Sequence, residues 1–244
     1  MVTRFLLAAL AAGMFAGFLM TPVQYTRIVP LILAAEEYEP GGAHYVVPAS
    51  EAAAHDHAAD DVTAIAGHHH EAGKSGEEEP LLLGRFWNTF FANLIAGAGF
   101  GLLLAGVSLL LGADVTVENG LVWGISAWLA VQFLPSLGLP PELPGFPEVD
   151  LMQRQIWWVA TIAASVLGIA LIVLRTEIWQ RLGGLVLLVL PHLYGAPRPV
   201  DVTSAVPAFY ASEFTVAALA TTLFFWLVLA SALGYAMDRM RRSA

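Results

Sequence analysis

The chain has 244 residues, of which 57% are hydrophobic and 13% are charged, and its mean hydropathy is +0.68. This composition excludes an ordinary soluble domain and identifies an integral membrane protein. The formal net charge of −9 is concentrated in residues 36–80, which hold eleven acidic residues and one basic residue, Lys74, for a local charge of −10. That acidity argues against nucleic acid as a partner. The lack of cysteine excludes disulfides and thiolate chemistry.

The first apolar stretch runs from Phe5 to about Gln24, which is the length that a helix needs to cross a bilayer. We interpret it as a membrane span and not as a cleavable signal peptide, because the run is too long for one and no clear small-residue cleavage site follows. Apolar residues resume after Arg27 in IVPLILAA. We therefore expect the helix to continue past the membrane surface, with a bend near Pro22 or Pro30.

Residues 36–80 are expected to form a disordered loop in which histidines gather among carboxylates. Six of the seven histidines of the chain lie here: His44, His55, His57, His68, His69 and His70. Imidazole and carboxylate are ligands that divalent transition metals accept well, so we predict a loose metal-collecting loop without a preformed site. The alternative is a solvated linker whose histidines have no task. Glu36 and Glu37, at its start, either pass an ion toward the membrane or simply end a solvated helix.

Five further apolar stretches follow: Phe86 to Leu111, Leu121 to Leu137, Gln155 to Leu174, Leu182 to about Tyr194, and Phe209 to Met237. We expect all of them to span comfortably except residues 182–194, which form either a full span or a re-entrant half-helix. The predicted fold class is therefore an all-α, polytopic transmembrane helical bundle with six spans, or five if 182–194 is re-entrant. Its parts are a first span with its extension (1–35), the acidic loop (36–80) and a five-helix bundle (81–244).

Basic residues predict the orientation, because cytoplasmic flanks of membrane spans are enriched in lysine and arginine. Six crossings that start inside the cell place these arginines in the cytoplasm: Arg4, Arg175, Arg181, Arg239, Arg241 and Arg242. Both termini are then cytoplasmic, and the histidine-rich loop is external.

Small residues recur at helical spacing in the first two stretches, as Gly13 with Gly17 and Gly97 with Gly101. In lipid, such spacing lets helix backbones approach closely. We favour tight packing inside one bundle over a dedicated dimer interface, although an assembly of identical copies stays open.

Polar residues inside the apolar stretches are candidates for a metal path. His192 follows Pro191, and an ionisable group in the membrane is costly and therefore suggests function; the proline also frees backbone carbonyls as oxygen ligands. The alternative is an interfacial histidine bonded to a neighbouring helix end. Gln24 and Gln132 either line the same polar path or only bridge helices. Glu142, in the proline-rich LPPELPG, is placed to point into an external vestibule. No GxSxG or HExxH motif is present, so we predict no enzyme.

Several stretches in order resemble one family: PLILAAEEYE, GLPPELPG, RQIWW, LPHLYGAP and the closing aromatic span. Over essentially the whole chain the sequence is similar to the CbtA family of predicted cobalt transporter subunits, for which five spans are usually counted. The resemblance implies cobalt uptake in the bacterial inner membrane, linked to vitamin B12 synthesis, with a small single-span partner, CbtB, that carries its own histidines. By this resemblance the candidate functional residues are Glu36, Glu37, Gln132, Glu142, Arg154, Trp157, Trp158, Pro191 and His192.

The sequence thus predicts a membrane subunit that takes up a divalent transition metal, with cobalt as the expected cargo and no tightly bound cofactor. Metal contact is expected from the six loop histidines, from Glu36, Glu37, Glu142 and His192, with Gln24 and Gln132 along the path. The alternative function is a non-transporting accessory or scaffold protein that binds metal or a partner subunit.

Overall fold

The computed structural model describes residues 2–38 and 78–242, and within these ranges every regular element is a helix. The elements are α1 (Val2–Arg27), α2 (Val29–Glu36), α3 (Glu78–Leu111), α4 (Gly120–Trp128), the π-helical turn η1 (Leu129–Phe133), α5 (Leu134–Ser136), α6 (Leu151–Leu174), α7 (Ile178–Tyr194) and α8 (Ala208–Arg242). Each of the six predicted apolar stretches corresponds to one helix or, for the third, to the continuous run from α4 to α5. The prediction of an all-helical fold is therefore confirmed for the described residues.

The helices differ in whether they are long enough to cross a membrane. Four are long and apolar enough to cross a membrane, namely α1, α3, α6 and α8. The run from α4 to α5 is a shorter apolar helix, Gly120–Ser136, so the expectation that it spans comfortably is not confirmed. It stops there because Pro140 and Pro141 follow and have no N–H with which to extend a helix. The run has 17 residues, as has α7, and both are about 26 Å long against about 30 Å for a hydrocarbon core.

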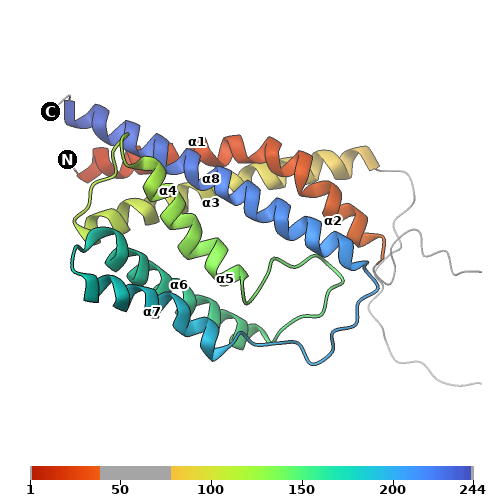
Figure 1. Cartoon of the computed structure of the whole chain (residues 1–244). Coiled ribbons are helices and arrows are strands. Elements are labelled where there is room, and N and C mark those ends of the chain that lie inside the picture. Colours follow the sequence, from red (N-terminus) through yellow and green to blue (C-terminus); the bar gives the residue numbers. More distant parts are fainter. Residues whose placement is uncertain (1, 39–77, 243–244) are drawn as a thin grey trace, which may run out of the picture.

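The helices pack in an order that differs from their order along the chain. α3 lies against α1, α1 against α8, α8 against α4, η1 and α5 against α6, and α6 against α7. Among the described elements, α7 makes extensive contacts with α6 alone. Both termini, the α3–α4 connection and the α6–α7 turn lie at one end of the bundle, here called the terminal end (Figure 1). The end of α2 and the segments 137–150 and 195–207 lie at the opposite end, the loop end.

The main core lies among α1, α3, α4 and α8, and α1 meets α3 at glycines. A Cβ atom at Gly13, Gly17, Gly97 or Gly101 would fall under 3.0 Å from a backbone carbonyl of the facing helix. The prediction that these glycines pack tightly within one bundle is confirmed. The buried hydrophobic residues of this core are Ala9, Ala12, Ala16, Met20, Leu104, Ala105, Val115, Phe225, Trp226, Leu229, Ala230, Leu233 and Met237.

A break separates α1 from α2 and produces the expected bend. Pro22 lies inside α1, whereas the break falls at Ile28, just before Pro30 in the first turn of α2. The backbone N–H of Ile28 still donates to the carbonyl oxygen of Gln24 at 2.8 Å, so the chain bends here without unwinding. Helical structure then continues to Glu36 and resumes at Glu78, inside both edges of the loop predicted for residues 36–80.

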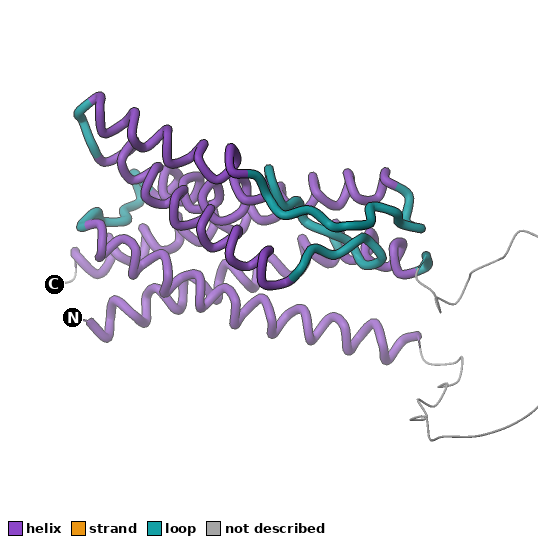
Figure 2. Tube along the Cα trace, turned by 90° about the horizontal axis from the view of Figure 1, so that it is seen from below, coloured by secondary structure: helices purple, strands orange, loops and turns teal. Residues whose placement is uncertain are grey.

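Two irregular segments fill the space at the loop end that the short helices leave. Figure 2 shows the segments 137–150 and 195–207 continuing beyond the ends of helices, beside the longer elements. Leu143 and Val206 from these segments are buried together with Ala35 of α2. The hydroxyl of Ser204 donates to the carbonyl oxygen of Gly145 at 2.8 Å and ties one segment to the other. The two segments are thus joined to each other and, through Leu143 and Val206, to α2, although residues such as Val200 and Val202 in the second segment are exposed.

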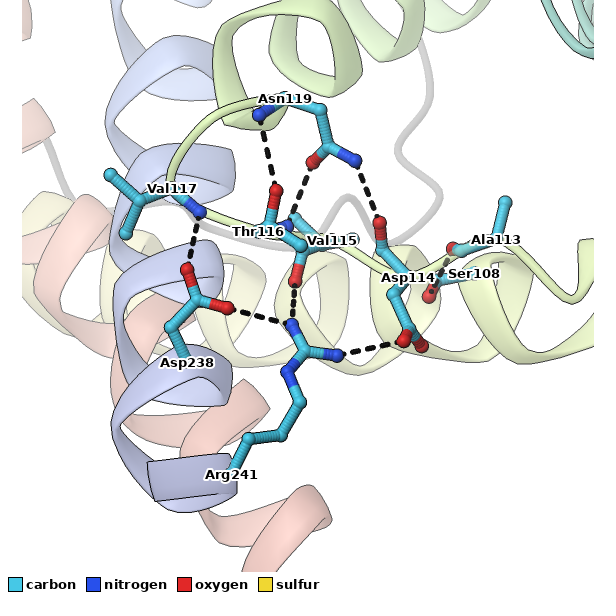
Figure 3. A network of polar contacts seen from close by, with 9 residues as sticks. All are labelled: Ser108, Ala113, Asp114, Val115, Thr116, Val117, Asn119, Asp238 and Arg241. Atoms are coloured by element: carbon cyan, nitrogen blue, oxygen red, sulfur yellow. Dashed lines mark hydrogen bonds and ion pairs between the residues drawn. The ribbon is translucent and has the colours of Figure 1, made fainter. Parts of the chain in front are cut away.

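At the terminal end, Arg241 of α8 holds the α3–α4 connection (Figure 3). Its guanidinium lies 2.8 Å from Asp114 and 2.9 Å from Asp238, and it also donates to the carbonyl oxygen of Val115 at 3.0 Å. Asp238 accepts a hydrogen bond from the backbone N–H of Val117 at 2.9 Å. These contacts join the last turn of α8 to the connection, so this end of the bundle is cross-linked by polar contacts.

Candidate functional site

Trp157 organises the loop end of α6. Its side chain is buried, and the indole N–H donates to the carbonyl oxygen of Pro191 on α7 at 3.3 Å. The ring also meets the imidazole of His192 edge-on, with centroids 5.9 Å apart. On its other side lies Gly138, where a Cβ atom would collide with the indole. One tryptophan therefore connects α6, α7 and the segment that follows α5, whereas neighbouring Trp158 is exposed.

His192 lies in the last turn of α7, and its Nε2 atom is buried without a hydrogen-bond partner. A buried imidazole nitrogen without a partner is costly, and native proteins keep few such groups. Pro191 has no N–H, so the carbonyl of Leu187 lacks its usual intrahelical donor. An imidazole nitrogen and a freed carbonyl oxygen are both ligands for a divalent transition metal.

Glu142 and Arg154 form an ion pair beside this tryptophan. The Arg154 guanidinium donates to the Glu142 carboxylate at 3.0 Å, and both side chains are half-buried. Asp150 caps the start of α6 by accepting a hydrogen bond from the backbone N–H of Gln153 at 3.0 Å. The carboxylate predicted to face a vestibule is thus placed at the loop end, where an arginine neutralises it.

Reversing the charge of Arg154 tests this pair. Arg154→Glu places two carboxylates together and is expected to lower the free energy of unfolding in detergent by about 1–2 kcal/mol. Adding Glu142→Arg restores opposite charges and is expected to recover most of that loss in a double-mutant cycle. Glu148→Arg, at an exposed position of the same segment, is the control. Additive effects of the two substitutions would contradict the pairing.

A second ion pair joins α2 to α3 at the loop end. The guanidinium of Arg85 donates to both carboxylate oxygens of Glu36, at 3.1 and 3.2 Å, whereas Glu37 is exposed. Arg85 was not identified from the sequence, although a lone arginine at the start of an apolar stretch is a usable signal. This pair holds the end of α2 against α3 at the point where the acidic segment begins.

The two glutamines predicted along a polar path lie in separate helix interfaces. Gln24 accepts a hydrogen bond from the side chain of Asn93 at 2.8 Å, and Asn93 also contacts Thr21 at 3.2 Å, so Gln24 bridges α1 and α3. Gln132 is half-buried in η1, which packs against α6 and α8. Isolated π-helical turns are frequent at functional sites. Pro135, three residues further on, removes a backbone donor in this region of the run.

The described residues contain no group of three or more histidine, aspartate or glutamate side chains that is arranged to hold a metal ion. Glu36, Glu37, Glu142 and His192 all lie at the loop end, yet they do not converge on one point. The predicted loop ligands His44, His55, His57, His68, His69 and His70 lie outside the described residues. The described site is accordingly a set of separate polar positions, of which His192, beside Trp157, is the one with an unused nitrogen.

Comparison with known families decides the identity of the chain. A family model described as "Probable cobalt transporter subunit (CbtA)" matches residues 2–238. The chain belongs to the CbtA family. No curated protein and no solved structure matches it. The resemblance inferred from PLILAAEEYE to LPHLYGAP is confirmed.

Family membership sets the broad function of this CbtA chain. The family is one of probable cobalt transporter subunits, which is a transport class and not an enzyme class. Together with four helices that are long and apolar enough to cross a membrane, it makes the chain a multi-pass membrane protein. The word subunit implies at least one further protein in the complex.

Proposed function

We propose that this CbtA chain is the membrane subunit that admits a divalent transition metal, with Co²⁺ as the cargo, into the cell. The observation that carries the proposal is His192, whose Nε2 atom is buried without a partner. An imidazole kept in this state in a membrane helix is suited to accept a metal ion that arrives from outside. The metal is substrate here, and no tightly bound cofactor is part of the proposal.

The proposed topology has six crossings in a bacterial inner membrane, with both termini cytoplasmic and the histidine-rich loop external. Successive long elements alternate in direction, and both termini lie at one end (Figure 1), as an even number of crossings requires. Arg175 and Arg181 flank the α6–α7 turn at that same end, where Arg239, Arg241 and Arg242 end α8. This distribution follows the enrichment of arginine on cytoplasmic flanks.

Charge at the loop end favours entry of a cation. In this proposal the six loop histidines gather the ion, and Glu36, Glu37 and Glu142 guide it, the first and the last by exchanging their arginine partners for the ion. Gln132 and His192 contribute to its path, whereas Gln24 bridges α1 and α3. The backbone N–H of Thr203 donates to Asp201 at 2.9 Å and holds the pKa of that carboxyl below its usual range. The membrane potential adds about 4.6 kcal/mol per 100 mV for a doubly charged ion, so ATP is not required.

The proposed partner is a small single-span membrane protein with its own histidines, similar to CbtB. The other candidate function is a scaffold that binds metal or a partner without transport, and it predicts a different result when the gene is deleted. If the chain were only a scaffold, metal uptake would persist in cells that lack it.

Uptake into proteoliposomes tests the proposal. The purified chain is reconstituted with and without the single-span partner, and the entry of Co²⁺, Ni²⁺ and Zn²⁺ is followed under an inside-negative potential. We expect Co²⁺ to accumulate in vesicles that hold the chain and its partner and to depend on the potential. The proposal fails if neither preparation exceeds empty vesicles for any of the three metals.

A further inference from the structure

The core among α1, α3, α4 and α8 offers no polar passage. Its buried residues are apolar, and Trp226 fills it together with aromatic neighbours, Phe100 at 5.2 Å and Phe225 at 5.7 Å between ring centroids. Three buried hydroxyls in these helices, Thr21, Ser108 and Thr221, each donate to a backbone carbonyl. None of the described residues of these helices has a buried side-chain nitrogen or oxygen atom that lacks a hydrogen-bond partner.

The interface between α6 and α7 is different. Only two buried side-chain nitrogen or oxygen atoms of the described residues have no hydrogen-bond partner, and both belong to this helix pair: Oγ of Ser165 on α6 and Nε2 of His192 on α7. Ser165 is 0% exposed. Most buried polar atoms in native proteins are paired, so two unpaired atoms in one interface need an explanation.

The register of the hairpin shows that Ser165 faces α7. The buried residues of α6 are Trp157, Thr161, Ser165 and Gly168, which share one helix face by their spacing. Trp157 contacts Pro191 of α7. Gly168 lies so close to Gly184 of α7 that a Cβ atom on either glycine would fall under 3.0 Å from the carbonyl oxygen of the other. The hydroxyl of Ser165 lies between these two contacts, about 12 Å along α6 from the level of Trp157.

Further oxygen ligands line the same stretch. Leu187 lies between Gly184 and Pro191 on α7, so its carbonyl, which lacks its intrahelical donor, belongs to the same part of the hairpin. The hydroxyl of Thr161 donates to the carbonyl oxygen of Trp157 at 2.7 Å and keeps lone pairs for a further contact. No carboxylate lies on this face of α6. A path made of one imidazole and neutral oxygen ligands binds a cation weakly. Weak binding is needed for transport, because the ion must also leave each site.

We propose that the cation crosses this chain between α6 and α7, with His192 as the outer station and Ser165 as the inner one. The proposal rests on the transport function proposed above and narrows its path to one helix pair. α7 suits the role because it packs extensively against α6 alone, so it can separate from α6 without disturbing the main core.

The lack of cysteine in the chain makes a direct test available. Ser165→Cys replaces the hydroxyl with a thiol of similar size, and Ala230→Cys, at a 0% exposed position of the main core, is the matched control. A membrane-impermeant, cationic methanethiosulfonate is added outside proteoliposomes that hold the chain and its partner. We expect the thiol at position 165 to react at least about 10-fold faster than the thiol at position 230 and Co²⁺ to slow the reaction, since metal ligation and thiol reactivity both need the thiolate.

The labelling does not require an active variant, so it decides the path even if Ser165→Cys transports poorly. Equal rates at the two positions, or a rate at position 165 that Co²⁺ leaves unchanged, would overturn the α6–α7 path. Uptake by the unmodified chain is measured in parallel. If that chain admits no metal at all, the proposed function fails whatever the label shows, which separates the two failures.

Discussion

Gly97→Ala is expected to destabilise the whole bundle, because it places a methyl group against a close backbone approach between α1 and α3. A Cβ atom at this position would lie under 3.0 Å from the carbonyl oxygen of Gly13 on α1. The helices would have to separate, and overpacking of this kind costs about 2–3 kcal/mol. The expected result is a lower Tm in detergent and less protein recovered from the membrane.

Gly99→Ala, two residues away on α3, is the matched control. A Cβ atom at Gly99 would meet nothing within 4 Å, and alanine has a higher helix propensity than glycine by about 1 kcal/mol. This variant should therefore be as stable as the unmodified chain or slightly more so. Equal destabilisation by the two substitutions would show that α1 and α3 do not meet at Gly13 and Gly97.

Hydropathy predicted the fold well because a helix is the simplest way to satisfy a backbone in lipid. The six apolar stretches all became helices, and Gly13 and Gly97 pack tightly within the bundle as expected, although their contact across α1 and α3 was not predicted. The bounds of the third helix were predicted to within one residue, since the apolar stretch from Leu121 to Leu137 corresponds to Gly120–Ser136. That this run is not among the helices long enough to cross a membrane was not expected.

The candidate site was predicted in part. His192 was singled out because an ionisable group is costly in an apolar stretch. Glu142 was singled out because the prolines beside it hold its backbone in place. Their surroundings were not predicted, since ion pairs such as Glu36 with Arg85 join residues far apart in sequence. Ser165 lies in no motif that would single it out in the sequence. That its hydroxyl is unpaired follows from helix packing, which no local pattern encodes.

The two halves of the bundle suit different tasks. The helices α1, α3 and α8 pack around an apolar core, and Arg241 joins α8 to the α3–α4 connection at the terminal end. The hairpin of α6 and α7 lies outside that core and keeps its unpaired polar atoms. In the path that we propose, α7 can move relative to α6 while the apolar core keeps its packing.

Removing the imidazole of His192 is expected to reduce metal uptake most strongly of the single substitutions. His192→Ala and His192→Phe both remove the unpaired Nε2 atom, and each should lower the initial rate of Co²⁺ uptake by about 10-fold or more, since even indirect metal partners cost this much. His192→Phe keeps a ring against Trp157, so its Tm should stay near that of the unmodified chain.

The comparison of these two variants separates coordination from packing. If His192 serves only to pack against Trp157, whose ring lies 5.9 Å away, His192→Phe would transport normally and His192→Ala would be both unstable and slow. If the nitrogen is the functional atom, both variants lose uptake while only the alanine loses stability. Tyr194→Ala, at an 88% exposed position two residues further on, should transport as the unmodified chain does. Normal Co²⁺ uptake by His192→Phe would remove His192 from the path, because phenylalanine has no ring nitrogen with which to bind the ion.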